Sequence, residues 1–235
     1  MDCRNSQEST LKEIFITQIE NKIISGEFEI GQKLPPEREL ACQMGVSRAV
    51  VNAGIVEMSR KGFLEIRPRV GTFVSDFRRN GTIETLVSIM KYHGGTMRPA
   101  EIKSLLEFRS VVDSMVIRLI GSNLSDEDAE TLDSLVESIG SAQTPAAAAA
   151  HNFRFHHELA LISGNTIVPL IYSSFRFSAI YLWERFARKY GISCLYSNSR
   201  ILLDYIKSGQ TDEAVLWKQR YTDKALSGEQ QIYED

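Results

Sequence analysis

A capped helix, a glycine break and a short hairpin are encoded between Ser47 and Val74. The segment opens with Ser-Arg-Ala-Val-Val-Asn, in which the serine precedes a helical run as an N-cap does. It closes with Leu and Ile alternating with Glu and Arg, and then with Gly-Thr-Phe-Val, as two paired strands would. A capped helix that runs into a two-stranded ribbon is the layout of a winged helix, which this pattern therefore predicts.

Two further helices are expected before this segment. Isoleucines recur at helical spacing from about residue 8 to residue 25, and Gly26 ends that pattern. A short second helix is expected after a Pro-Pro pair, because Glu37 and Glu39 in its first turn suit the helix dipole. The polar, turn-prone residues 76–81 mark a domain boundary. We therefore predict a winged helix-turn-helix domain, with three helices and a two-stranded wing, over residues 1–78.

The remaining residues, 79–235, are expected to form an all-α domain. Their apolar residues follow a helical period, and no alternating strand pattern occurs. Glycine, proline and asparagine breaks divide them into six or seven helices, expected at residues 82–93, 99–121, 125–140, 145–163, 166–190, 192–208 and 211–227. The predicted fold class is therefore mainly α, with an N-terminal winged helix-turn-helix and a C-terminal helical bundle.

The length and composition of the chain indicate how many domains it can form and in which cellular compartment it is expected. The chain has 235 residues, of which 43% are hydrophobic and 24% charged, so each of two domains can bury its own core. Cys3, Cys42 and Cys194 are too scattered for a disulfide framework or a zinc site, so we expect a cytoplasmic protein. The polar N-terminus and the lack of any run of about 18 apolar residues predict no signal peptide and no membrane partner.

Charge is unevenly distributed along the chain. The formal net charge is −3, yet residues 33–79 carry nine Lys or Arg against five Asp or Glu, whereas residues 80–235 carry 15 against 19. The basic excess therefore falls on the predicted helix and wing, which are the two kinds of element that the grooves of duplex DNA admit. This distribution indicates double-stranded DNA as a partner.

Several short motifs are spread over almost the whole chain. They are Gly26 with Gly31, residues 34–41, residues 45–48, Lys61 with Gly62, residues 71–74, residues 107–109, residues 152–156 and residues 163–165. With these motifs the sequence resembles the GntR family of bacterial transcription regulators, in its FadR-type branch with a helical FCD effector domain. The resemblance implies a regulator, and not an enzyme, that binds an operator through its winged helix.

We expect nine residues to contact the operator: Arg38, Ser47, Arg48, Ala49, Asn52, Arg67, Arg69, Gly71 and Thr72. The first four match positions that touch DNA in the family. Arg48 suits a bidentate pair with guanine, Ser47 suits a phosphate, and Asn52 suits adenine or a phosphate. The residues of the wing suit the minor groove or the backbone. The alternative is that Arg48 and Arg67 are ordinary solvated surface charges.

Two departures from the family pattern predict a variant half-site. Asn52, Ala53 and Gly54 stand where the family usually has Arg-Glu-Ala, and Arg69 stands where glycine is common. Glycine costs about 1 kcal/mol relative to alanine inside a helix. Gly54 therefore either permits close packing or marks a looser helix.

The resemblance also points to a metal, because many members of this branch hold a divalent ion with one Asp and three His. The matching positions here are Asn152, His156, Ser199 and Tyr221. One imidazole is a poor set of ligands for zinc or nickel, so we expect no metal and no cofactor. A metal-dependent sensor with a remodelled site is the alternative.

The same four residues are expected to line an effector pocket together with Arg109. Arg109 is a natural partner for an anionic effector, although it could instead pair with Asp113 one helical turn away. His156 could equally be a satisfied core histidine. Aromatic residues within 166–190 make an acyl-CoA one candidate beside other carboxylic acids.

The resulting hypothesis is a homodimeric regulator that binds a pseudo-palindromic operator and responds to a small anionic metabolite. The competing hypothesis is an enzyme of the helical bundle that uses His156 as a base. No nucleophile stands at a recognisable spacing from that histidine, and neither a carboxylate pair nor a glycine-rich phosphate loop occurs. The sequence therefore favours the regulator.

Overall fold

The computed structural model describes residues 2–92, 99–121, 124–227 and 229–232. The chain divides into two compact units, Met1–Gly94 and Gly95–Asp235. Most of the described residues are helical, and the only sheet among them is a two-stranded antiparallel one. The mainly α fold class is thereby confirmed. No helix among these residues is both long enough and apolar enough to cross a bilayer.

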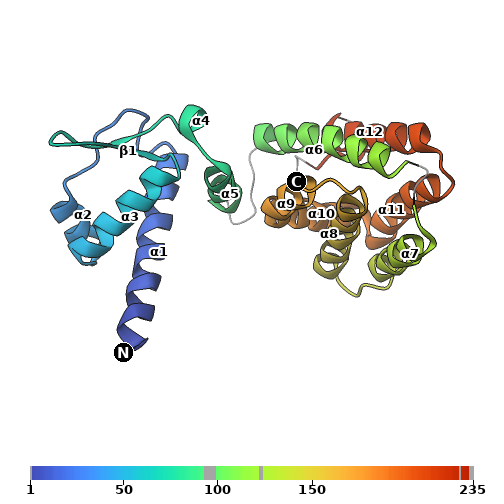
Figure 1. The fold of residues 1–235 in the computed structure, drawn as a ribbon, viewed down its shortest axis with the longest axis horizontal. Coiled ribbons are helices and arrows are strands. Elements are labelled where there is room, and N and C mark those ends of the chain that lie inside the picture. Colours follow the sequence, from blue (N-terminus) through green and yellow to red (C-terminus); the bar gives the residue numbers. More distant parts are fainter. Residues whose placement is uncertain (1, 93–98, 122–123, 228, 233–235) are drawn as a thin grey trace. The chain divides into compact units, whose positions relative to one another are not determined.

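The first unit is a winged helix followed by two short helices (Figure 1). Its elements are α1 (Asp2–Ile24), α2 (Glu37–Met44), α3 (Arg48–Arg60), β1 (Leu64–Arg67), β2 (Gly71–Val74), α4 (Phe77–Asn80) and α5 (Ile83–Tyr92). The strands pair antiparallel, with Leu64 opposite Val74 and Arg67 opposite Gly71. The three helices and the two-stranded wing expected from the sequence are all present.

The core of this unit lies where α1 crosses α3 and meets the base of the wing. Phe15, Ile19, Met58 and Phe63 are each at most 1% exposed there. Burying each such side chain contributes roughly 1.5–3 kcal/mol relative to leaving it in water. The core therefore fixes α3 on the long first helix and leaves the opposite face of α3 to solvent.

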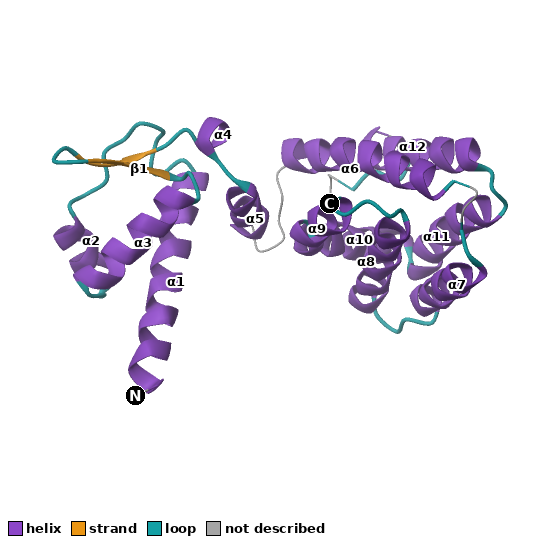
Figure 2. Cartoon of the chain, in the orientation of Figure 1, coloured by secondary structure: helices purple, strands orange, loops and turns teal. Residues whose placement is uncertain are grey.

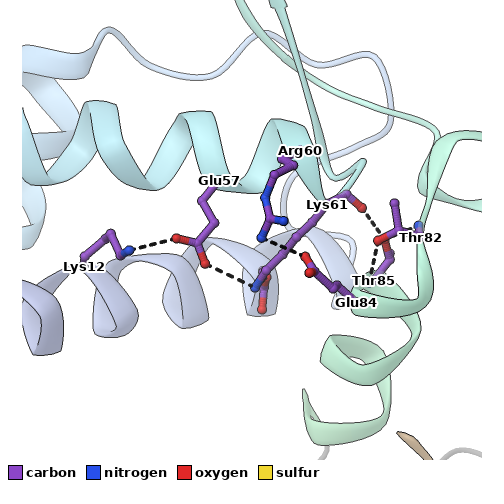
Figure 3. A network of polar contacts seen from close by, with 8 residues as sticks. Lys12, Glu57, Arg60, Lys61, Thr82, Glu84 and Thr85 are labelled. Carbon is purple, nitrogen blue, oxygen red and sulfur yellow. Dashed lines mark hydrogen bonds and ion pairs between the residues drawn. The ribbon is translucent and has the colours of Figure 1, made fainter. Parts of the chain in front are cut away.

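Helix α5 is attached to the end of α3 (Figure 3). The hydroxyl of Thr85 donates to the backbone carbonyl of Lys61, and Arg60 forms an ion pair with Glu84 at 3.1 Å. Thr82 caps the first turn of α5, because its hydroxyl accepts from the backbone N–H of Thr85 at 3.4 Å, and Thr85 Oγ1 accepts in return from the backbone N–H of Thr82 at 2.8 Å. The contacts therefore group α4 and α5 with the winged helix, whereas the sequence places the boundary after residue 78.

A cluster of charged side chains continues from there onto α1. The ammonium of Lys61 lies 3.1 Å from the carboxylate of Glu20 and 4.0 Å from that of Glu57. Lys12 approaches Glu57 to 2.9 Å, and the hydrogen bond from Lys12 is the main cause that lowers the pKa of Glu57. Three helices, α1, α3 and α5, are thus joined around the C-terminal end of α3.

The second unit is all helical (Figure 2). Its helices are α6 (Pro99–Ile120), α7 (Asp126–Gly140), α8 (Pro145–Ile162), α9 (Val168–Ser174), α10 (Arg176–Tyr190), α11 (Ile192–Lys207) and α12 (Thr211–Ser227). Helix α6 packs along α12, while α8 packs between α7 and α10. The single helix expected at residues 166–190 is instead two helices, because the backbone leaves the helical region at Phe175.

Candidate functional site

The N-terminal end of helix α3 is exposed to solvent on one face. Ser47 stands at the N-cap, where its hydroxyl accepts a hydrogen bond from the backbone N–H of Val50 at 3.2 Å. Apolar side chains at helical spacing on this helix lie in the core, and none of them is more than 3% exposed: Val51, Ile55 and Met58. Arg48, Ala49 and Asn52 are consequently exposed.

Gly54 allows α3 to lie close to α1. A Cβ atom at this position would fall 2.4 Å from Cδ1 of Phe15, which is itself fully buried. Of the two readings of this glycine, the structure supports close packing. The departure from the family pattern at Gly54 is therefore explained by the large Phe15 ring on the facing helix.

Two arginines are left available beside this turn. Arg38 in the first turn of α2 and Arg48 in the first turn of α3 are exposed, and neither forms a hydrogen bond or ion pair with the part of the chain that is described. The side-chain amide of Asn52 donates to Glu37 at 3.3 Å in an exposed contact. Asn52 is thus bonded to α2 in the structure, which contains no DNA. A hydrogen bond this long and this exposed is easily replaced by one to another acceptor.

Arg67 on the wing is already engaged. Its guanidinium donates two hydrogen bonds to the Glu65 carboxylate, at 3.0 and 2.8 Å, and lies 4.3 Å from the centre of the Phe73 ring. The hydrogen bond to Glu65 is the main cause that raises the pKa of Arg67. A phosphate that approached Arg67 would therefore compete with a carboxylate on the same strand.

The tip of the wing is a tight turn with a strained arginine. Arg69 has a φ of 64° and is the only described residue other than glycine with a positive φ. The N–H of Val70 donates to the carbonyl of Arg67 at 3.0 Å, and Pro68 precedes Arg69, which is typical of a type II turn. Glycine fits that position without strain, so an exposed Arg69 there is an unusual choice of side chain.

One basic residue near the wing was not among the expected contacts. The backbone of Lys33 forms a bridge with that of Phe73, and its side chain lies across Gly71, where a Cβ atom would meet Lys33 Cε at 2.5 Å. The carbonyl of Thr72 accepts a hydrogen bond from Leu34 at 2.9 Å. Gly71 and Thr72, both half-buried, thus hold Lys33 on the wing. In the sequence, the positive charge of Lys33 was the one sign of a role in DNA binding, because its distance along the chain from the wing gave no indication of this contact.

The five expected effector residues gather around Trp183 in the second unit. Three small cavities have this indole in their walls. Asn152, His156, Ser199 and Tyr221 line one of them, which has a volume of about 10 Å³. Arg109 instead lines the other two cavities, of about 30 and 10 Å³.

Arg109 is 8% exposed and stacks on Trp183, with its guanidinium carbon 4.2 Å from the ring centre. Asp113, one turn further along α6, lies 3.9 Å from the guanidinium. That carboxylate is much closer to Lys218 of α12, at 2.9 Å, and it also accepts a hydrogen bond from the phenol of Tyr172. The pair between Arg109 and Asp113 is therefore present but loose.

Lys218 was missed by the sequence reading. It is 4% exposed and borders both the cavity of about 30 Å³ and the cavity that contains His156. Its neighbours at helical spacing, Val215, Thr222 and Ala225, are buried on the same face of α12. The position of Lys218 within a stripe of buried residues could have indicated its burial. Because lysines are rarely buried, however, a lysine in a sequence is normally expected to be exposed.

His156 lies against Trp183, with ring centres 4.9 Å apart and ring planes 15° apart. Burial, followed by the positive charges of Lys218 and Arg109, holds the pKa of His156 well below its usual value. On the same wall, the hydroxyl of Ser199 donates to the Asn152 side-chain carbonyl at 2.7 Å. Because its pKa is lowered in this way, the imidazole of His156 is uncharged at neutral pH.

These residues do not fit a divalent metal. Asn152 and Ser199 are bonded to each other, Tyr221 is a phenol whose pKa is raised by burial, and only His156 offers an ordinary metal ligand. The ammonium of Lys218 lines the same cavity. No cluster of three or more His, Cys, Asp or Glu side chains suited to a metal occurs within the described ranges. The ammonium repels a metal cation, and one imidazole without a carboxylate or a thiolate in the same cavity is too few ligands for zinc or nickel.

Comparison with known proteins agrees with this two-part arrangement. Residues 12–74 match the family described as bacterial regulatory proteins, gntR family, and residues 104–222 match the FCD domain. The HTH-type transcriptional regulator Mce2R of Mycobacterium tuberculosis is 29% identical over 171 residues, which are 73% of this chain and 70% of that protein.

A fatty acid metabolism regulator protein of Shewanella pealeana is 30% identical over 158 residues, which are 67% of this chain and 64% of that protein. The solved structure of Lar, described as controlling expression of the Listeria monocytogenes agr system, has a TM-score of 0.64 at 14% identity. That match covers 92% of this chain and 94% of Lar. At so low an identity the likeness concerns the fold alone.

Proposed function

Because the chain belongs to the GntR family of bacterial regulatory proteins and carries an FCD domain, it is a DNA-binding transcription regulator, and we propose that it binds a pseudo-palindromic operator as a homodimer. In this proposal each winged helix takes one half-site, and a small anionic effector in the helical domain controls binding. The observation that carries the proposal is the exposed, unpaired Arg48 on the first turn of a capped helix.

Arg48 is the proposed base reader. A guanidinium at the start of a recognition helix reaches guanine O6 and N7 in the major groove, which contributes about 1–3 kcal/mol of discrimination. Arg38, Ser47, Ala49 and Asn52 complete the surface around it. The wing, through Arg67, Arg69, Gly71 and Thr72, follows the backbone or the minor groove, with Lys33 as a further cation.

The proposed homodimer is supported by an apolar stripe on α6. Phe108, Val111, Met115 and Leu119 recur at helical spacing and are between 40% and 72% exposed. Exposed apolar side chains that line up along one helix face are typical of an interaction surface. A second copy of the same chain, related by a two-fold axis, would cover this stripe with an identical one.

An effector of small size fits the helical domain best. Ligand pockets commonly have volumes of about 300–1,000 Å³. The largest of the three cavities around Trp183 has only about 30 Å³, so a short carboxylic acid is favoured over an acyl-CoA in this conformation. The similarity to a fatty acid metabolism regulator keeps acyl-CoA as the second candidate. In either case the effector must prefer one arrangement of the dimer, typically by about 1–3 kcal/mol.

DNase footprinting upstream of the neighbouring genes tests the proposal. We expect a protected pseudo-palindrome, and we expect Arg48→Ala to reduce the preference for it over random DNA by about five- to 150-fold. Arg188→Ala, which removes an exposed arginine of α10 away from the α6 stripe, is the matched control and should leave protection unchanged. Protection without sequence preference, or none at all, would refute the proposed operator.

A further inference from the structure

Among the described residues of the helical domain, more positive than negative charge is buried. Arg109 and Lys218 are 8% and 4% exposed, and Asp113, at 3%, is the only carboxylate that lines the three cavities as they are described. His156 adds no charge at neutral pH. Two cations and one anion leave an excess of one positive charge in the interior.

Such an excess is costly, because a buried ion without a counter-ion loses its hydration and gains nothing in exchange. Its effect is visible on Lys218, whose pKa is lowered by burial and by Arg109 although Asp113 acts in the opposite direction. Asp113 is meanwhile shared between Lys218 at 2.9 Å and Arg109 at 3.9 Å. One further negative charge between the two cations would complete the balance.

The cavity that these three residues share has the right lining for a short acid. Its polar wall is formed by Arg109, Asp113, Lys218, Tyr221 and Thr222, and its remaining wall is apolar: Leu106, Leu182, Trp183, Phe186, Ala225 and Ile232. Its volume is about 30 Å³, whereas one water molecule needs about 10–15 Å³ on the same measure. A carboxylate with a tail of one or two carbons is therefore close to the limit of what enters without repacking.

We infer that this cavity binds a short, singly charged carboxylate between Lys218 and Arg109, and that Asp113 limits the bound charge to one. The carboxylate oxygens accept hydrogen bonds from the ammonium and the guanidinium, and the alkyl tail lies against the apolar wall. A second carboxylate on the ligand would meet Asp113 in a low-dielectric interior, where like charges repel strongly. The inference specifies the effector of the proposed regulator and rests on that proposal.

Three ligands of equal carbon count separate charge from shape: propionate, malonate and propionamide. Isothermal titration calorimetry on the full chain at neutral pH should show that propionate binds and that malonate and propionamide bind at least tenfold more weakly. Lys218→Met removes the excess charge and should weaken propionate at least tenfold, while Lys218→Arg should retain binding. Arg118→Met, at an exposed position on α6, is the control.

Asp113→Asn provides the decisive variant, because it raises the buried excess to two positive charges. We expect its preference to shift from propionate toward malonate by at least tenfold. Circular dichroism verifies that each variant is folded, and if Lys218→Met does not fold, the Asp113→Asn result decides.

Malonate binding the unaltered chain as tightly as propionate, or Asp113→Asn leaving the preference unchanged, would overturn the inference. Because calorimetry contains no DNA, a failed footprint with intact propionate binding refutes the operator and not the anion site. The reverse result refutes the anion site and not the operator.

Discussion

Gly54 shows how a single side chain can reverse a general rule. Glycine to alanine inside a helix ordinarily stabilises by about 1 kcal/mol. In this protein the added methyl group would meet Phe15 at 2.4 Å, so we expect Gly54→Ala to destabilise the fold by about 1–3 kcal/mol. Urea unfolding measures the change.

The adjacent residue supplies the control for that substitution. Ala53 is exposed on the same helix, so Ala53→Gly should follow the ordinary propensity and lose about 1 kcal/mol. A stabilised Gly54→Ala variant would mean that α1 and α3 are not packed as described, and that the glycine marks a loose helix instead.

His156 predicts a loss of stability in acid. Its pKa in the folded chain is well below the ordinary value of about 6.5 that applies on unfolding, chiefly because the ring is buried. Below pH 6.5 the unfolded chain therefore binds a proton that the folded chain does not, and unfolding becomes easier as the pH falls. The contribution is fully present above pH 6.5.

Denaturant unfolding at pH 7.5 and pH 5.5 measures this effect. We expect the native chain to lose on the order of 1 kcal/mol more between the two pH values than His156→Gln does. Equal losses in the two proteins would indicate that His156 is protonated inside the folded domain, which would add a positive charge beside Lys218.

At the scale of elements, the tie between α5 and α3 carries a prediction. Thr85→Val removes the hydrogen bond to the Lys61 carbonyl, which contributes about 0.5–1.5 kcal/mol. We expect faster hydrogen exchange of backbone amides in α5, with α6 unchanged, as measured by mass spectrometry. Ser104→Ala deletes a hydrogen bond to a helix carbonyl at an exposed site and should leave α5 unchanged. Equal exchange in α5 of both variants would contradict the tie.

The elements themselves were largely predictable from the sequence. The stripe of Val51, Ile55 and Met58 fixed which face of α3 is buried, and breaker residues located most helix ends. The division at Phe175 was not predictable, because no glycine or proline marks it and apolar periodicity continues through it. The ion pair and the hydrogen bond that join α5 to the end of α3 could not be predicted either, because their partners are 24 residues apart in the chain.

The candidate sites were predictable in outline but not in their electrostatics. Sequence reasoning placed Arg109 and His156 in one pocket, yet it missed Lys218, whose charge decides what the pocket attracts. It also expected Arg67 to contact the operator, and in the structure that guanidinium is paired with Glu65. Lys218 is paired with Asp113 of another helix, which only folding brings close, whereas Glu65 and Arg67 are two residues apart on one strand and so lie on the same face.

At the scale of the whole molecule, the stripe on α6 predicts assembly. Val111→Glu places a charge on the most exposed member of the stripe, so we expect the dimer to dissociate and operator affinity to fall. Analytical ultracentrifugation measures the mass. Leu161→Glu, at an exposed apolar position on α8, is the control and should stay dimeric. A native chain that sediments as a monomer at micromolar concentration would refute the homodimer.

The stack of Arg109, Trp183 and His156 has a spectroscopic consequence. The chain contains two tryptophans, Trp183 and Trp217, and both border the cavity that includes His156. Indole emission depends on the charges and water around the ring, so a bound anion would change the colour and intensity of the protein's own fluorescence. The winged helix, which contains no tryptophan, would contribute nothing to that signal. Tryptophan fluorescence of this protein therefore reports on the helical domain and not on the winged helix.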